Sequence, residues 1–366
     1  MSRDAEQLLR AAVHDLAGSG PSAGPEPLAR AAIRRGRWIR RRRRAGIGLV
    51  VILAIAATTA PHRLLSRSEQ ETAAPLTGTP SVIDTVDPDW TTRPLELPGG
   101  WIVLGASASA ATGQPAMVFD RHAGRYRDIA GFQQVVPSPD GDVVAVTQEG
   151  RPRQIGLLDL ATDEVRWFET GQHILEPQWS PDGSRLLVTI SDKDSGEQAF
   201  ATVAAADGVV RTFPVDISQA HLCTDVCRFT WARGGDEVAL SQTDPGEPRS
   251  ESLPHARRGI QFFSPDDGRP TRFLPIRGDV VGPWSFSPDD RQAVVKGQHG
   301  AQLVDTGTGE VRGGLPSEQM FWVGPDRLLD TRSNGYVELT DLAGDVLVRQ
   351  LLPDRLTGTQ LSVGPG

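Results

Sequence analysis

Short apolar runs that follow tight polar turns recur along the chain from residue 98 onward. The turn regions read PGGWIVLG, SPDGDVVAV, SPDGSRLLV, ARGGDEVAL, SPDDRQAVV and GPDRLLDT, and they are marked by Pro98, Pro139, Pro181, Arg233, Pro288 and Pro325. Successive turns lie 41, 42, 52, 55 and 37 residues apart. Pro, Asp and Gly favour tight turns, and the short apolar runs beside them favour strands. The pattern predicts a repeated β unit of roughly 40 residues.

A second pattern of strand, polar turn and strand follows most of these turns. Its copies read MVFDRHAGRYRDI, LLDLATDEVRWF, TVAAADGVVRTF, FFSPDDGRPTRF, LVDTGTGEVRGG and LTDLAGDVLVRQ. Each copy has an arginine in its last strand: Arg127, Arg166, Arg211, Arg272, Arg312 and Arg349. Two independent markers therefore give the same count of six units.

Four short strands per unit, without a helical period, predict a mainly β fold with six propeller blades over residues 82–366. A β-sandwich is the alternative, but it does not predict six similar units. Stacking the blades in a ring gives each sheet face a neighbour, and closing the ring removes exposed edges. Two segments compete for the closing strand. Residues 82–97 could supply the innermost strand of the first blade, or residues 354–363 could do so.

The sequences WSPDGSRLLVT (179–189), PSPDGDVVAVT (137–147) and FSPDDRQAVV (286–295) resemble the WD40-like, TolB-type family of propeller repeats. The resemblance spans roughly residues 97–352, and it weakens at TWARGGDE and WVGPDR, which leaves open whether the fourth and sixth blades are complete. It implies a rigid platform that binds proteins or peptides at a channel mouth or rim. It implies no reaction, and no functional residue carries over from the repeat motif.

A continuous apolar run covers residues 45–60, directly after the arginines Arg40, Arg41, Arg42, Arg43 and Arg44. A helix of these 16 residues would be about 24 Å long, close to the thickness of the bilayer core. We therefore predict one transmembrane signal-anchor helix. A cleaved signal peptide is the alternative, but its charged leader is usually much shorter than the 44 residues found here, and Pro61 follows the run directly.

The arginine run predicts the orientation of this helix, because positive residues beside a membrane segment stay in the cytoplasm. Residues 1–44 would then be a cytoplasmic basic tail, residues 61–81 a flexible linker, and the propeller extracytoplasmic. The run would also attract anionic membrane lipid. The complete layout resembles a group of single-pass actinobacterial membrane proteins.

Charge argues against binding to nucleic acid. The chain has a net charge of −8, which divides into +7 for residues 1–44 and −15 for the rest. The acidic body repels phosphates, and the basic run lacks a folded surface. Residues 4–17 have the apolar spacing of a short amphipathic helix. This helix could rest on the inner leaflet, or it could dock a cytosolic partner such as a transcription regulator.

The only two cysteines, Cys223 and Cys227, lie in the sequence HLCTDVC. An extracytoplasmic location favours a disulfide, which would order the loop between the third and fourth blades. A metal site that also uses His221 and Asp225, or two free thiols, are the alternatives.

Other motifs are explained without catalysis. GPSAG (20–24) matches the nucleophile elbow of hydrolases, but it lies in a Gly/Pro stretch without a strand before it. LVDTGTG (303–309) contains the Asp-Thr-Gly of aspartic proteases, but Asp305 aligns with hairpin residues of other units, which predicts a turn residue. The long polar loop 241–259 is either a binding element or a solvated flap.

These observations predict a membrane-anchored extracytoplasmic propeller that binds a protein or peptide in the cell envelope. We expect no catalysis, no metal and no cofactor. The first alternative is a transmembrane signalling component whose tail docks a cytosolic regulator. The second is an enzyme, which would require acids or histidines clustered at the channel mouth.

Overall fold

The computed structural model describes residues 79–108, 113–170, 174–191, 198–217, 223–225, 228–248, 255–331 and 335–366. The predicted tail, the apolar run 45–60 and Arg40, Arg41, Arg42, Arg43 and Arg44 lie outside these residues, so their roles stay predictions. Within the described part of the chain, no helix is both long enough and apolar enough to cross a membrane.

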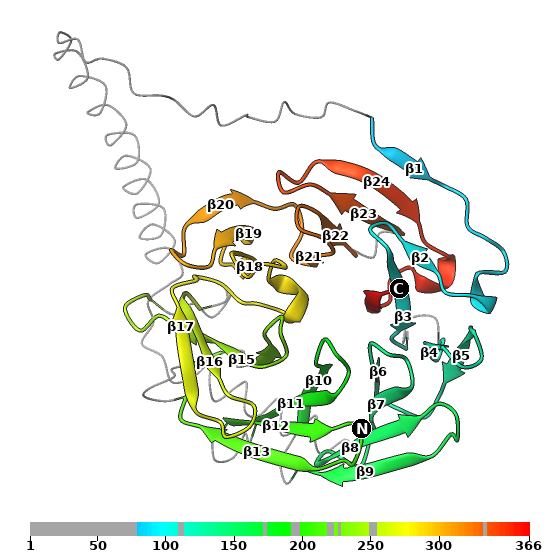
Figure 1. Cartoon of the computed structure of the whole chain (residues 1–366), viewed down its shortest axis with the longest axis horizontal. Helices are drawn as coiled ribbons and strands as arrows, with labels where there is room; N and C mark the ends of the chain where they lie inside the picture. The colour runs from blue at the N-terminus through cyan, green and yellow to red at the C-terminus, as the bar shows by residue number, and fades with distance from the viewer. Residues whose placement is uncertain are drawn as a thin grey trace, which may run out of the picture. The chain divides into compact units, whose positions relative to one another are not determined.

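The described residues form six sheets arranged in a ring, which confirms the predicted six-bladed propeller (Figure 1). From the inside outward, blade 2 contains β6 (Gln134–Pro137), β7 (Val143–Thr147), β8 (Gln154–Asp159) and β9 (Val165–Glu169). Blade 3 contains β10 (Ile174–Trp179), β11 (Arg185–Ser191), β12 (Gln198–Ala204) and β13 (Val210–Val215). Blade 4 contains β14 (Phe229–Trp231), β15 (Val238–Thr243), β16 (Arg257–Phe263) and β17 (Pro270–Leu274).

The remaining blades depart from this plan. Blade 5 contains β18 (Gln292–Gly297), β19 (Gly300–Asp305) and β20 (Val311–Gly314). Blade 6 contains β21 (Met320–Trp322), β22 (Leu328–Asp330), β23 (Tyr336–Thr340), β24 (Val346–Leu351) and β1 (Ser81–Ile83). Blade 1 contains β25 (Leu361–Pro365), β3 (Trp101–Ala106), β4 (Ala116–Asp120) and β5 (Arg125–Ile129), with β2 (Glu96–Leu97) beside β3. Short 3-10 helices are η1 (Trp90–Thr92), η2 (Pro283–Ser285) and η3 (Asp354–Leu356).

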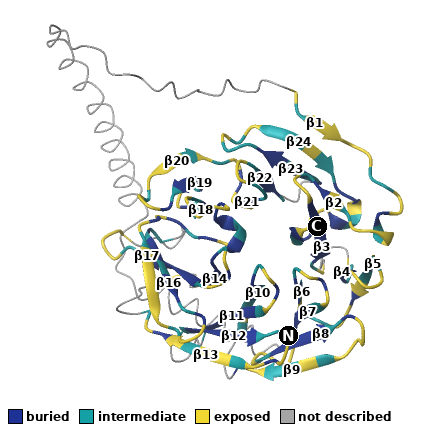
Figure 2. Cartoon of the chain, viewed as in Figure 1, coloured by how far each residue is buried: buried dark blue, intermediate teal, exposed yellow. Residues whose placement is uncertain are grey.

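Packing between blades explains why the middle strands are apolar on both faces. The second and third strands of each blade are largely buried, whereas most residues of the outermost strands are intermediate or exposed (Figure 2). The buried apolar residues form clusters that each join two neighbouring blades. In one of them, the ring of Phe200 of blade 3 packs at a tilt against that of Phe229 of blade 4, with ring centroids 5.2 Å apart. Each such aromatic side chain contributes roughly 1.5–3 kcal/mol through burial.

The C-terminal tail closes the ring. β25 pairs antiparallel with β3 from Leu361 opposite Ala106 to Pro365 opposite Trp101, so the tail supplies the innermost strand of blade 1. The early segment does not have this role. Its strand β1 adds to the outer edge of blade 6, and β2 pairs with β3 only at Trp101 and Ile102. The structure thus decides between the two closing segments that the sequence left open.

The repeat motif did not predict which blade is irregular. Blades 4 and 6, where the motif is degraded, have all four strands among the described residues, whereas blade 5, with the sequence SPDD, has lost its innermost strand. Only the isolated bridges Asp279 to Lys296 and Phe286 to Ala293 remain of that strand. Gly282 and the helix η2, which begins at Pro283, take the place of this strand, because proline lacks the N–H that a ladder requires.

The Ser-Pro-Asp-Gly motif builds the turn between the first two strands of a blade. In blade 3 the Ser180 hydroxyl donates to the Asp182 carboxylate at 2.6 Å and accepts from the Arg185 N–H at 3.0 Å. Gly183 follows with φ of 70°. In blade 4 Gly235 keeps the same φ of 70°, and Ala232 N–H bonds to the Glu237 carbonyl, so the turn forms without the Ser–Asp pair.

Asp290 occupies the fifth turn at the position of this glycine, with φ of 56°. We predict that Asp290→Gly raises the free energy of unfolding by about 1 kcal/mol, because a left-handed backbone disfavours side chains. Burial also raises the pKa of Asp290, although Arg272 and Arg233 oppose the rise. A raised carboxyl pKa destabilises the folded chain as pH increases above about 4.

The gain from Asp290→Gly should therefore be larger at pH 7 than at pH 4, as urea unfolding at the two pH values would show. The matched control is Gly183→Asp, which introduces the same strain in blade 3 and should lower stability. A variant D290G that is no more stable than the native chain at pH 7 would contradict this account.

The six repeated arginines have two structural roles. Three contact the next blade: Arg127 donates to the Leu160 carbonyl at 2.6 Å, Arg166 to the Ala205 carbonyl at 3.1 Å, and Arg211 lies 3.9 Å from Asp266. The other three pair within their own blade, namely Arg272 with Glu237, Arg312 with Asp305 and Arg349 with Glu338. The arginine marker therefore belongs to the blade scaffold.

Candidate binding surface

The antiparallel strand order gives the ring two different faces. The turn face carries the turns between the first and second strands and the hairpins between the third and fourth strands. The opposite face carries the loops between the second and third strands and the links from blade to blade; we call it the connection face. Loops on one face of a rigid scaffold are where binding residues most often lie.

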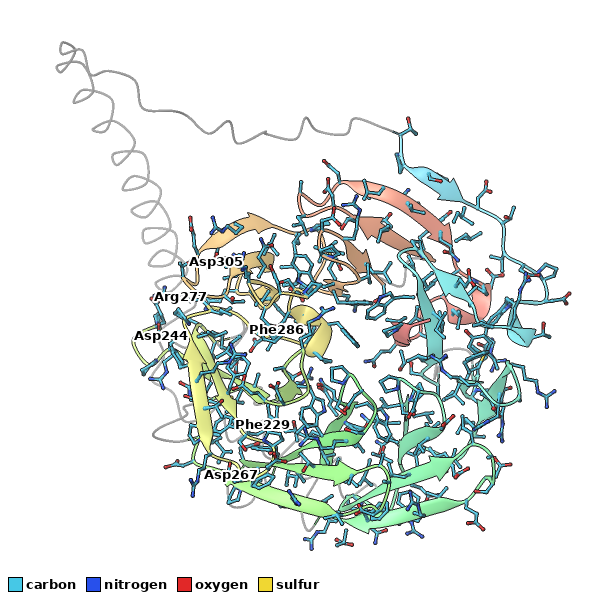
Figure 3. All side chains as sticks on the ribbon, viewed as in Figure 1. Phe229, Asp244, Asp267, Arg277, Phe286 and Asp305 are labelled. Carbon is cyan, nitrogen blue, oxygen red and sulfur yellow. The ribbon has the colours of Figure 1, made fainter. Side chains whose placement is uncertain are left out.

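Residues 279–286, which replace the innermost strand of blade 5, contact blades on both sides; we call them the central segment. The Val281 carbonyl accepts a hydrogen bond from Gln178 Nε2 of blade 3 at 3.1 Å, so this contact passes over blade 4. The Phe286 carbonyl accepts one from Arg233 of blade 4 at 2.6 Å. Phe286 lies beside η2 on the inner side of the ring (Figure 3).

Trp284 gives the central segment a contact on the opposite side, with blade 1. Its ring packs edge-on against Trp101 of blade 1 with centroids 5.0 Å apart, although blade 6 separates these blades in the ring. The Arg233 guanidinium lies 5.3 Å from the centroid of Trp284. The central segment, which belongs to blade 5, thus contacts blades 1, 3 and 4 near the axis.

A strained backbone lies on the connection face beside this segment. Glu176 has φ of 42°, and the pairing of β10 with β11 shifts register between Leu175 and Gln178. Strain of this kind costs about 1–3 kcal/mol and is concentrated at functional sites. The Glu176 carboxylate pairs with Arg228, which directly precedes β14, at 2.8 Å.

Two large apolar side chains are exposed at the same end of the ring. Leu175 is 43 % exposed and Val281 is 51 % exposed. Gln178, three residues after Leu175 in the same strand, donates a hydrogen bond to the Val281 carbonyl. We define Leu175, Glu176, Arg228 and Val281 as the mouth surface. It combines apolar contact area with one ion pair, and its backbone is held by three blades.

A buried ion cluster supports blade 4 on the connection face. The Arg257 side chain is 3 % exposed, and it donates to Asp225 at 2.6 Å and to both oxygens of Asp279 at 2.8 and 3.2 Å. Asp225 belongs to the link from blade 3, and Asp279 begins the central segment. Arg257, the first residue of β16, therefore binds both the link from blade 3 to blade 4 and the link from blade 4 to blade 5.

His255 and Thr224 extend this cluster. The Asp225 carboxylate accepts from the His255 backbone N–H at 2.9 Å, and His255 Nδ1 lies 2.7 Å from the Thr224 hydroxyl. Burial opposes ionisation of Asp225, but hydrogen bonds from Arg257 and the His255 N–H outweigh it and lower the pKa of Asp225. Burial likewise opposes the charge of Arg257, and the two aspartates raise its pKa. The shifts in pKa keep both Asp225 and Arg257 charged, so the two side chains remain paired.

Cys223 lies next to this cluster. It is buried, it is disulfide-bonded, and its N–H bonds to the Ile217 carbonyl at 3.0 Å. Cys227 and His221 lie outside the described residues, so the pairing of Cys223 with Cys227 stays a prediction. Among the described residues, no group of three or more His, Cys, Asp or Glu side chains is placed to hold a metal ion.

Asp305 is a turn residue, as its alignment with other hairpins predicted. Its Oδ1 accepts from the N–H groups of Gly307 and Thr308 at 3.1 and 3.0 Å, and its Oδ2 binds Arg312. The hydrogen bond from Arg312 and those from Thr308 lower the pKa of Asp305 to about 2.

No protein-family model and no curated protein matches the chain. Many solved structures are similar to it, and three of them follow. TolB from Acinetobacter baumannii is 18% identical over 73% of this chain and 67% of its own, with a TM-score of 0.48. The β-propeller domain of the Trilobed protease from Pyrococcus furiosus is 16% identical over 69% and 82%, with a TM-score of 0.44. The acylaminoacyl peptidase from Pyrococcus horikoshii is 16% identical over 68% of this chain, with a TM-score of 0.42, and the match spans only 44% of that peptidase. These similarities concern the fold alone.

Proposed function

We propose that this protein is a membrane-anchored extracytoplasmic platform that binds a protein or peptide at the mouth surface of its propeller, without catalysis. The observation that carries the proposal is the exposure of Leu175 and Val281 beside the strained backbone of Glu176. Membrane anchoring is supported by the apolar run 45–60 and the arginines before it. Binding by the N-terminal tail to a cytosolic partner stays a separate prediction.

The mouth surface is suited to binding because it is held rigidly. Gln178 accepts a hydrogen bond from the Thr230 hydroxyl at 2.7 Å while it donates to the Val281 carbonyl, so blades 3, 4 and 5 share one side chain. A preorganised apolar surface loses little conformational entropy when a ligand binds. The Glu176–Arg228 pair beside it offers one charge of each sign to a polypeptide.

Binding at the mouth can be tested by photocrosslinking in intact cells. A photoreactive residue at Val281 should form an adduct with a partner, and the additional change Leu175→Asp should abolish the adduct. Val311 is the matched control, because it is 50 % exposed but follows a hairpin of the turn face. Adducts of equal yield at Val281 and Val311, or an adduct that survives L175D, would overturn the proposed mouth.

The location can be tested by adding protease to spheroplasts that express the chain with a C-terminal tag. External protease should remove the tag while a cytosolic control protein stays intact, and Cys223 should run as oxidised on a non-reducing gel. A protected tag together with reduced thiols would place the propeller in the cytosol, and it would overturn the orientation drawn from Arg40 to Arg44.

A further inference from the structure

The N-terminal strand β1 lies on the outer edge of blade 6, along β24 (Figure 1). The two strands run parallel, with Ser81, Val82 and Ile83 opposite Val348, Arg349 and Gln350. We call residues 81–83 the strap. The strap begins at the last residue of the predicted linker 61–81, and residues 84–89 then lead to η1.

The backbone, and not the side chains, holds the strap in place. Val82 is 54 % exposed, Ile83 is 41 % exposed, and Ser81 is exposed as well, so the strap buries little apolar area. A three-residue ladder of this kind opens at a small free-energy cost compared with global unfolding.

Ring closure does not require the strap. β25 closes the ring from inside blade 1, and the apolar clusters between blades lie under the middle strands. Displacing the strap would therefore leave the propeller closed. It would expose the outer edge of β24, which is a template for pairing with another strand.

The edge of β24 is longer than the strap. β24 spans the six residues Val346–Leu351, and the strap pairs with Val348, Arg349 and Gln350. A strand that paired along the whole edge would form more ladder hydrogen bonds, each worth about 0.5–1.5 kcal/mol net. Such a strand would displace the strap.

We propose that the outer edge of blade 6 is a docking site for an extended strand of a partner polypeptide, which the strap occupies until the partner displaces it. The seated strap shows the chemistry of the occupant: an extended, parallel segment with β-branched residues, as in Ser-Val-Ile, recognised by its backbone. Side-chain pockets contribute little, because Arg349 is engaged by Glu338 at 2.6 Å. The site is separate from the mouth surface and does not depend on the function proposed there.

The first test uses a labelled peptide with the sequence of residues 79–86, TPSVIDTV, and full-length purified protein. In the variant S81P/V82P/I83P no strap residue can donate to the ladder, whereas the control S81A/V82A/I83A keeps all three N–H groups. We expect the proline variant to bind the peptide at least tenfold more tightly than the native chain. The alanine control should behave like the native chain, because the strap side chains are exposed.

Absence of peptide binding by the folded proline variant would overturn the proposal. Equal binding of a peptide N-methylated at the positions of Val82 and Ile83 would also overturn it, because recognition would then not use the backbone. A second measurement needs no strap variant. An eight-residue peptide of alternating threonine and valine, added to the native chain, should speed hydrogen exchange at Val82 and Ile83 several-fold, and unchanged exchange would contradict displacement.

Discussion

Ending the chain at Gly358 will lower the free energy of unfolding by about 4 kcal/mol, because blade 1 loses its innermost strand and its ladder to β3. β25 pairs with β3 from Leu361 to Pro365, and Leu361 and Val363 pack on the cluster between blades 6 and 1. A change of this size corresponds to a drop in Tm of roughly 10 °C for a domain of this size. Calorimetry of the full-length and shortened chains measures it.

The matched comparison is the strap variant S81P/V82P/I83P, which removes the pairing of the other chain end. This variant should lose only about 1–2 kcal/mol, because it removes one short three-residue ladder whose side chains are already exposed. Equal losses from the two changes would mean that both ends close the ring. A shortened chain as stable as the native one would show that the tail is not the closing strand.

Blade number was predictable from the sequence because the turn chemistry is local. Proline, aspartate and glycine fix the backbone within four residues, and SPDG at residues 180–183 forms the expected hydrogen bonds. Closure was not predictable, because residues 82–97 and 354–363 both have strand character. The choice depends on which of them fits beside β3, and the paired residues of the tail and β3 lie 255 to 264 positions apart in sequence.

The mouth surface also could not be found from local patterns. The only signals were Pro177 in an inner strand and the pair Gly282–Pro283 before the fifth turn, and these indicate irregular backbone without indicating where it lies. Gln178 shows the reason. It has an ordinary strand environment in sequence, but its contact with Val281 joins residues 103 positions apart.

The substitution Arg257→Met will lower the free energy of unfolding by about 3–5 kcal/mol, because it leaves the carboxylates of Asp225 and Asp279 without their buried cation. Methionine keeps most of the side-chain volume, so the loss reports mainly on charge. The surface pair of Lys296 with Glu318 is the control, since Lys296→Met should cost less than about 1 kcal/mol. Urea unfolding at pH 7 compares the variants.

Two further measurements separate charge from packing in this prediction. The triple variant R257M/D225N/D279N should recover most of the lost stability, because no uncompensated charge remains.

In the native chain the lowered pKa of Asp225 gives stability that is present above its unfolded pKa and is lost as the pH falls through the folded pKa. In R257M the burial of Asp225 is no longer offset by the arginine. Protonation of Asp225 at lower pH removes this buried charge and restores part of the lost stability. The difference in free energy of unfolding between the native chain and R257M should therefore be smaller at pH 4 than at pH 7. An equal difference at both pH values would show that Arg257 acts through packing.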